Sequence, residues 1–142
     1  MKNKIRNITC IVALASLVAG CATNLTTPFD ESAFQPYAGK GTSTITGQAF
    51  EKTNGGDVKF GAGNEVSLVP VTTYTTEMIQ TWRRNSVFGP PQTNPQLQKY
   101  IRQVVADGNG NFEFQNVPAG NYYVVCPIFW KVPGEPLPTG AV

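Results

Sequence analysis

The chain has 142 residues, a length typical of a single domain, and only 14% of them are charged. Glycine (14 residues) and proline (11 residues) are frequent, which favours a turn-rich β domain over a helical bundle. The sequence contains no histidine, and this excludes Ser-His-Asp and Cys-His catalysis as well as histidine-based zinc sites.

Residues 1–20 have the pattern of a secretion signal. Lys2, Lys4 and Arg6 make the start of the chain positive, and an apolar run follows over residues 8–20. This run is shorter than the roughly 20 residues that span a bilayer core, so it indicates a signal and not a transmembrane helix. Its removal leaves eight basic and nine acidic residues, a formal net charge of −1 that gives no reason to expect nucleic-acid binding.

The signal ends in Val18-Ala19-Gly20-Cys21, which resembles the lipobox of bacterial lipoproteins. The resemblance implies that a peptidase cleaves before Cys21, that the Cys21 sulfur carries a diacylglycerol and that the new amino group is acylated. Two or three acyl chains give stable membrane anchoring. Because residue 22 is Ala and not Asp, the resemblance implies the outer membrane of a Gram-negative bacterium. The alternative is an ordinary secretory signal that is cleaved elsewhere.

Residues 21–41 are predicted to be a tether between the lipid and the folded domain. They are rich in polar residues, proline and glycine, and they show no clear periodicity. Twenty flexible residues have an r.m.s. span on the order of 25 Å. Phe34 and Tyr37 are the candidates for packing onto the domain, which we expect to occupy residues 42–142.

The first half of that domain reads as two strands and a helical insertion. Residues 42–50 and 65–70 are expected to form strands, with a turn at Asn54-Gly55-Gly56. Within an insertion over residues 71–99, Met78, Ile79 and Trp82 fall on one face of a helix from Thr73 to Arg84. Thr73 or Thr75 is expected to cap that helix, and Asn94-Pro95 to open a further helical turn.

The second half carries the clearest β pattern. Strands are expected over residues 100–106, 112–115 and 121–126, the last one extending through residues 128–130. The segment 107–111 is interpreted as a hairpin turn and not as an EF-hand loop, because Phe112 stands where that loop needs glycine and no glutamate follows at its twelfth position. Cys126 has no cysteine partner in the mature chain and is interpreted as a buried small hydrophobe in the third of these strands.

Residues 107–114 together with 117–122 resemble the D-x-x-G-x-F-x-F-x-x-V-P-x-G-x-Y run of carboxypeptidase regulatory-like domains. The resemblance implies a mainly β fold, a small antiparallel β-sandwich of the prealbumin (transthyretin) type. The helical insertion over residues 71–99 is a departure from the family pattern, because it is longer than the usual hairpin there. The resemblance implies no activity, because a fold does not determine a function. Such a sandwich usually adds a closing strand, and Gly140-Ala141-Val142 is interpreted as only the start of one, so an open sheet edge is expected there.

Two sets of residues are candidate functional sites. Glu77, Arg83 and Arg84 on the predicted helix form a candidate partner surface, with a solvated helix face as the alternative. Tyr123 and Trp130 form a candidate ligand platform, with burial in the core as the alternative. The sequence indicates no catalytic residue, metal site or cofactor.

The first functional hypothesis is a non-catalytic, lipid-anchored envelope protein that binds another envelope component, either a protein or a glycan. The second is a carbohydrate- or small-ligand-binding module. A third is a surface-exclusion lipoprotein of the kind that phages and plasmids encode.

Overall fold

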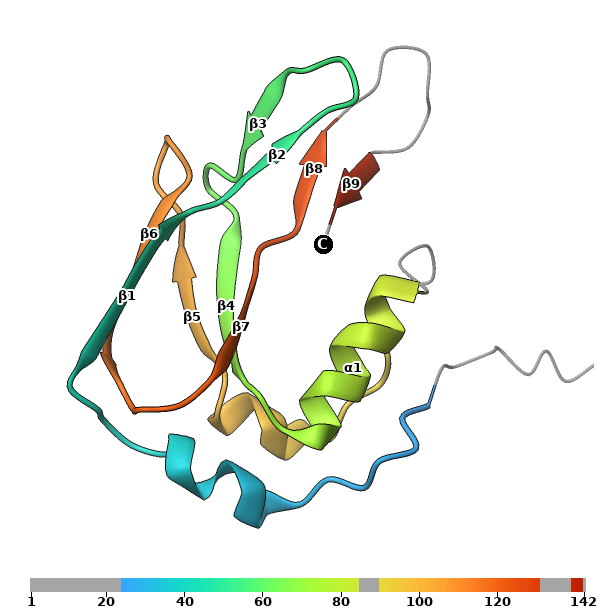
Figure 1. The fold of residues 1–142 in the computed structure, drawn as a ribbon, viewed down its shortest axis with the longest axis vertical. Helices are drawn as coiled ribbons and strands as arrows, with labels where there is room; N and C mark the ends of the chain where they lie inside the picture. The colour runs from blue at the N-terminus through green and yellow to red at the C-terminus, as the bar shows by residue number, and fades with distance from the viewer. Residues whose placement is uncertain (1–23, 85–89, 131–138, 142) are drawn as a thin grey trace, which may run out of the picture.

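The computed structural model describes residues 24–84, 90–130 and 139–141, and these residues form a mainly β fold with antiparallel sheets (Figure 1). The elements in chain order are η1 (Glu31–Tyr37), β1 (Ser43–Gln48), β2 (Phe50–Lys52), β3 (Val58–Phe60), β4 (Glu65–Pro70), α1 (Thr73–Arg84), η3 (Pro95–Lys99), β5 (Arg102–Val105), β6 (Asn111–Val117), β7 (Tyr122–Val125), β8 (Ile128–Trp130) and β9 (Thr139–Ala141). The predicted β-sandwich with a helical insertion between β4 and β5 is confirmed.

Two sheets form the sandwich. One has the strand order β5-β4-β7, and the other consists of β1 and β6, with all pairs antiparallel. Their facing sides enclose a core that includes Val66, Leu68, Phe114 and Val117, each no more than 2% exposed. Alternation along β4 explains the arrangement, because Val66 and Leu68 face this core while Ser67 and Val69 face the opposite side.

A helical layer covers the opposite side of the β5-β4-β7 sheet. There, Val69 packs in a second core with Tyr74 and Met78 of α1 and with Leu97 of η3. Thr72 caps α1: its hydroxyl accepts from the Thr75 N–H, and its own N–H donates to Thr75 Oγ1. The cap is therefore Thr72, and not Thr73 or Thr75 as the sequence suggested. The turn at Asn94 is confirmed, since its side chain accepts from the Gln96 N–H at 2.9 Å.

The interpretation of residues 21–41 as an irregular tether is wrong for the part that the structure describes. Residues 31–37 form a 3₁₀ helix, and Phe34 is completely buried in the second core. Its ring stacks on Phe29 at a centroid distance of 5.0 Å and lies 5.1 Å from the ring of Tyr100. Burial of the Phe34 ring offsets part of the conformational entropy that the segment loses on ordering, and the ring contacts with Phe29 and Tyr100 add to it.

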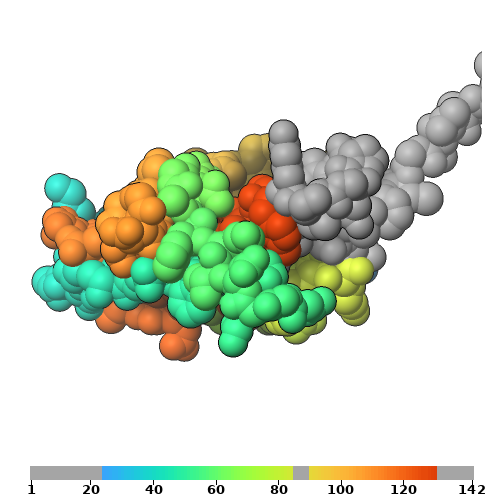
Figure 2. All heavy atoms as spheres, turned by 90° about the horizontal axis from the view of Figure 1, so that it is seen from above, coloured from blue at the N-terminus to red at the C-terminus, as the bar shows by residue number. Residues whose placement is uncertain are grey.

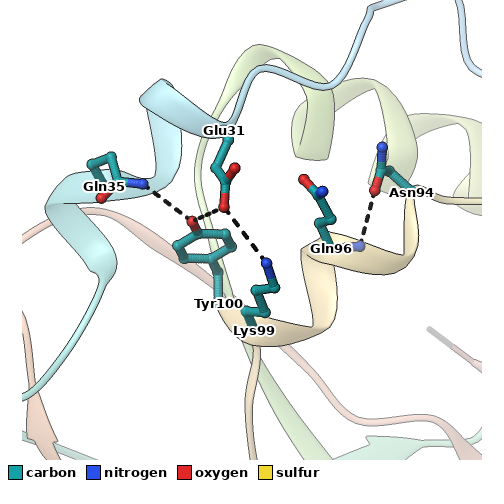
Figure 3. Close-up of polar contacts among 6 residues, drawn as sticks. All are labelled: Glu31, Gln35, Asn94, Gln96, Lys99 and Tyr100. Atoms are coloured by element: carbon teal, nitrogen blue, oxygen red, sulfur yellow. Dashed lines mark hydrogen bonds and ion pairs between the residues drawn. The ribbon is translucent and has the colours of Figure 1, made fainter.

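Polar contacts between η1 and the end of η3 add to this docking (Figure 3). The Tyr100 hydroxyl donates to Glu31 Oε1 at 3.0 Å and accepts from Gln35 Nε2 at 3.4 Å. The Lys99 ammonium lies 3.7 Å from the same glutamate oxygen. Burial and the neighbouring Glu31 carboxylate raise the pKa of the Tyr100 hydroxyl above its usual range, which favours the protonated form that donates to Glu31.

Three strands differ from the sequence prediction. The expected strand 42–50 is interrupted at Ala49, after which β2 leaves the β1–β6 sheet and pairs with β3. The short strand β3 was not anticipated, because Val58 and Phe60 are both about half exposed and produce no burial pattern. β8 does not extend β7; it pairs with β9 in a separate hairpin.

The turn between β5 and β6 depends on glycine at position 110. Gly110 has φ +80°, and a Cβ there would lie 2.4 Å from the Ala49 carbonyl oxygen. We therefore expect Gly110→Ala to lower the free energy of unfolding by about 1–3 kcal/mol, as measured by chemical denaturation. Gly108→Ala in the same turn is the matched control, because its Cβ would meet no atom within 4 Å. Equal effects of the two substitutions would contradict this explanation.

Candidate functional site

An apolar hollow lies between α1 and the outer face of the β5-β4-β7 sheet. We call it the cleft; its volume is about 490 Å³, within the range of small-ligand sites. β4, β5 and β7 form its floor, and α1 and η3 form its walls. The described residues that line it are Asn64, Glu65, Ser67, Val69, Met78, Ile79, Trp82, Pro90, Pro91, Thr93, Leu97, Gln98, Ile101, Gln103, Val125, Pro127 and Phe129.

The polar part of the cleft is a small network on the sheet. Gln103 Nε2 donates to Glu65 Oε1 at 2.5 Å and to Ser67 Oγ at 3.4 Å. Ser67 and Gln103 are direct cross-strand partners, which explains why their side chains share one face. Glu65 and Gln103 are both exposed, so the second carboxylate oxygen and the amide oxygen are available to a ligand.

Aromatic groups lie on the walls of the same cleft. Trp82 is half-buried on the last turn of α1, and Phe129 of β8 is 64% exposed. A cleft lined by an indole, a carboxylate and an amide offers both apolar contact and directional hydrogen bonds. This combination suits a ligand that has an apolar face and polar edges.

A second hollow of about 430 Å³ opens on the other side of α1. Its lining brings together Arg83 of the predicted partner surface and Tyr123 of the predicted platform. The Tyr123 hydroxyl lies 3.0 Å from Thr76 Oγ1, which ties β7 to α1. Apolar side chains that remain about half exposed, Phe50 and Val124, complete it.

The other predicted site residues are dispersed. Trp130 is half-buried in β8 and belongs to the lining of neither hollow. Arg84 is exposed at the end of α1. Cys21 and the signal lie outside the described residues. Cys126 is half-buried beside Gly61, and burial raises the pKa of its thiol, which agrees with a packing role.

Glu77 holds the chain segment that precedes η1. Its carboxylate accepts from the Thr26 N–H at 2.8 Å, the Thr26 hydroxyl at 2.7 Å and the Thr27 N–H at 2.7 Å. We call this set of three bonds the Glu77 clasp. The hydrogen bonds from Thr27 and Thr26 lower the pKa of Glu77 from 4.5 to about 2. Most of the acceptor capacity that the partner-surface interpretation assigned to Glu77 is therefore used within the chain.

The clasp should open in acid. A carboxyl group whose pKa is lowered by folding stabilises the docked segment fully above its unfolded pKa of about 4.5 and loses this effect as the pH falls toward 2. We expect the Thr26 and Thr27 amide signals to shift with a midpoint near pH 2 in an NMR titration. Glu77→Gln should remove that transition, while Glu113→Gln, an exposed acid on β6, should leave it. A midpoint near 4.5 in the unaltered protein would contradict the clasp.

The polar cleft residues were missed at the sequence level. The signal was present in the alternation of β4, where Glu65 and Ser67 lie on the face away from Val66 and Leu68. The apolar helix face predicted from Met78, Ile79 and Trp82 does face the cleft, where Met78 is buried and Trp82 stays partly exposed.

Two negative findings concern the described residues alone. They contain no cluster of three or more side chains of the types that bind metals. None of the helices in residues 24–84 and 90–130 has both the length and the apolar character needed to cross a bilayer.

The fold and the cleft together define a small β-sandwich protein with a helical insertion and a ligand-sized hollow. A crystal structure of a Pseudomonas aeruginosa protein, described there as a proposed carbohydrate-binding protein, has a similar fold, with a TM-score of 0.69 and 24% sequence identity. The match covers 80% of this chain and 84% of that chain. At this identity the similarity establishes the fold alone.

No family model matches the sequence, and no curated protein matches it. The resemblance to carboxypeptidase regulatory-like domains therefore stays a prediction.

Proposed function

We propose that the chain is a non-catalytic, lipid-anchored envelope protein whose cleft binds a saccharide. The observation that carries the proposal is that Trp82 and the hydrogen-bonded Glu65–Gln103 pair line the same cleft. Pyranose rings have an apolar C–H face and a rim of hydroxyl groups. The first fits an indole face, and the second fits carboxylate and amide groups.

Anchoring follows from the lipobox-like residues 18–21, with Cys21 as the acylated residue. Two or more acyl chains would hold the protein in a membrane stably, and Ala22 favours the outer membrane. The role suggested for the Pseudomonas aeruginosa protein of similar fold is consistent with a saccharide ligand.

The proposal of a binding role and not an enzymatic one rests on the side chains themselves. The sequence has no histidine. Glu65 in the cleft is exposed and already accepts a hydrogen bond from Gln103. Such a carboxylate is suited to binding hydroxyl groups, whereas glycoside hydrolysis needs a second carboxylate at a defined distance, and Glu65 is the only acid among the described residues that line the cleft.

The proposal is tested by NMR titration of the mature chain carrying Cys21→Ser, which keeps it free of lipid. The titrants are chitotriose, a muramyl disaccharide and a lipopolysaccharide core oligosaccharide. We expect one of them to shift the signals of Trp82, Gln103 and Ser67 in a saturable way. Shifts confined to the second hollow, or none with any titrant, would overturn the saccharide assignment.

A protein partner at the second hollow is the other candidate. The observation in its favour is the combination of half-exposed Phe50 and Val124 with the Arg83 guanidinium in one hollow. Apolar groups beside an arginine are typical of protein interfaces. Crosslinking from Arg83→Cys in intact cells should then capture an envelope protein, and Gln98→Cys on the cleft side is the matched control.

A further inference from the structure

The start of the described chain is fastened to the helical layer at two points. Asn24 forms a parallel bridge with Gln92, and the Glu77 clasp holds Thr26 and Thr27 at 2.7–2.8 Å. Residues that were expected to keep the domain away from the membrane are instead part of the domain. The linker between the folded domain and a lipidated Cys21 is therefore much shorter than the sequence suggested.

The maximum length of this linker follows from covalent geometry alone. Three residue steps separate Asn24 from Cys21, and a fully extended chain spans at most about 3.6 Å per residue. The lipid attachment point therefore lies within about 11 Å of Asn24. A flexible tether of 20 residues would instead have an r.m.s. span on the order of 25 Å.

Two arginines lie at the end of the domain near this attachment point. Arg83 and Arg84 are exposed on the last turn of α1. The two ion pairs found among the described residues use Lys59 and Lys99, so neither arginine has a carboxylate partner there. In Figure 1 the point where the chain leaves the domain and the C-terminal end of α1 lie on the same side of the molecule. Figures 1 and 2 both place the β5–β6 turn at the opposite end.

We infer that the domain sits on the bilayer by the C-terminal end of α1, with Arg83 and Arg84 against anionic lipid headgroups and the Glu77 clasp fixing this orientation. The inference rests on the lipidation of Cys21 in the proposed function and not on the saccharide assignment. Trp82, Pro91 and Thr93 of the cleft lie beside the same end, next to Arg83 and Gln92 in the chain. The cleft would then meet ligands that are themselves carried at the membrane surface, which deepens the proposed function.

The test uses the lipidated protein purified from membranes, with its mass confirmed, in vesicles of phosphatidylcholine and phosphatidylglycerol that contain a nitroxide-headgroup lipid. A fluorophore is attached at Gln80→Cys on α1 or at Asn109→Cys in the distant β5–β6 turn, both in a Cys126→Ser background. We expect strong quenching at position 80 and weak quenching at position 109. Equal quenching at the two positions would show a freely tumbling domain and overturn the inference.

A charge variant distinguishes contact of the domain with lipid headgroups from attachment through the acylated Cys21 alone. From the usual strength of arginine contacts with anionic surfaces, Arg83→Gln/Arg84→Gln should lower the ratio of seated to unseated protein about 30-fold. Quenching at position 80 of the variant should then fall to the level at position 109. In vesicles of phosphatidylcholine alone, quenching at position 80 of the protein with both arginines should fall in the same way. Lys52→Gln/Lys59→Gln on the β2–β3 hairpin is the matched control and should change nothing. Unchanged quenching in the arginine variant would overturn the headgroup contact, and a mass without lipid would overturn both the anchoring and this inference.

Discussion

Replacing Phe34 by alanine is expected to lower the free energy of unfolding by about 3–5 kcal/mol, the usual cost of removing a buried aromatic side chain. Phe34 is 0% exposed and packs against Phe29 and Tyr100 in the core beneath α1. The effect should appear in chemical denaturation followed by circular dichroism, as a lower midpoint with an unchanged slope. A loss of this size would show that residues before the predicted domain boundary belong to the cooperative fold.

The matched control is Phe129→Ala, the same substitution at a side chain that is 64% exposed. We expect it to change stability by no more than about 1 kcal/mol, because little apolar surface is removed from contact. If Phe34→Ala lowered the free energy of unfolding no more than Phe129→Ala does, residues 30–41 would be a tether after all. The argument for a short linker to Cys21 would then fail as well.

Replacing Trp82 by alanine is expected to weaken saccharide binding about 30-fold or more. Central tryptophans in binding sites commonly contribute 2 kcal/mol or more, and each 1.4 kcal/mol corresponds to about a factor of ten in affinity. Trp82 lines the cleft from the last turn of α1 and is only half-buried, so its removal should leave the fold intact. Isothermal titration with the saccharide that shifts the cleft signals would measure the change.

Trp130→Ala is the matched control, because Trp130 is the other tryptophan of the chain and does not line the cleft. It should leave the affinity unchanged within about twofold, well under 1 kcal/mol. The reverse result, with Trp130 essential for binding and Trp82 dispensable, would place the ligand site at Trp130, as the sequence analysis suggested.

The sequence predicted the fold where local chemistry dominates. The helix Thr73–Arg84 has the predicted bounds, because its apolar face and its flanking turn residues act within a few positions of one another. The turn at 107–111 forms because the Asp107 carboxylate accepts from the Asn109 and Asn111 N–H groups at 2.8 Å, while Gly110 supplies the positive φ.

The docking of residues 24–37 could not be predicted in the same way. It depends on Phe34 meeting Leu97 and Tyr100 and on Thr26 meeting Glu77, contacts that join positions 51 to 66 residues apart. A single aromatic residue in a polar segment produces no periodic pattern. The short strand β3 was missed for a related reason, since its large side chains stay half exposed.

The candidate site was predicted only in part. Arg83 and Tyr123 do line a common hollow, although neither the helix period nor the strand alternation indicated that they would meet. The pairing of Glu65 with Gln103 required the register of β4 against β5, which places Ser67 opposite Gln103. Register is set by turns and core packing across the whole sheet and cannot be read from one strand.

Intact-mass analysis of the mature protein from cell membranes tests the central claim most directly. Membrane anchoring, the orientation of the domain on the bilayer and access to membrane-carried ligands all depend on the lipidation of the Cys21 sulfur. We expect a chain that begins at Cys21 and carries a diacylglycerol thioether with an acylated amino group. A chain that begins at another residue, or an unmodified Cys21, would contradict the account.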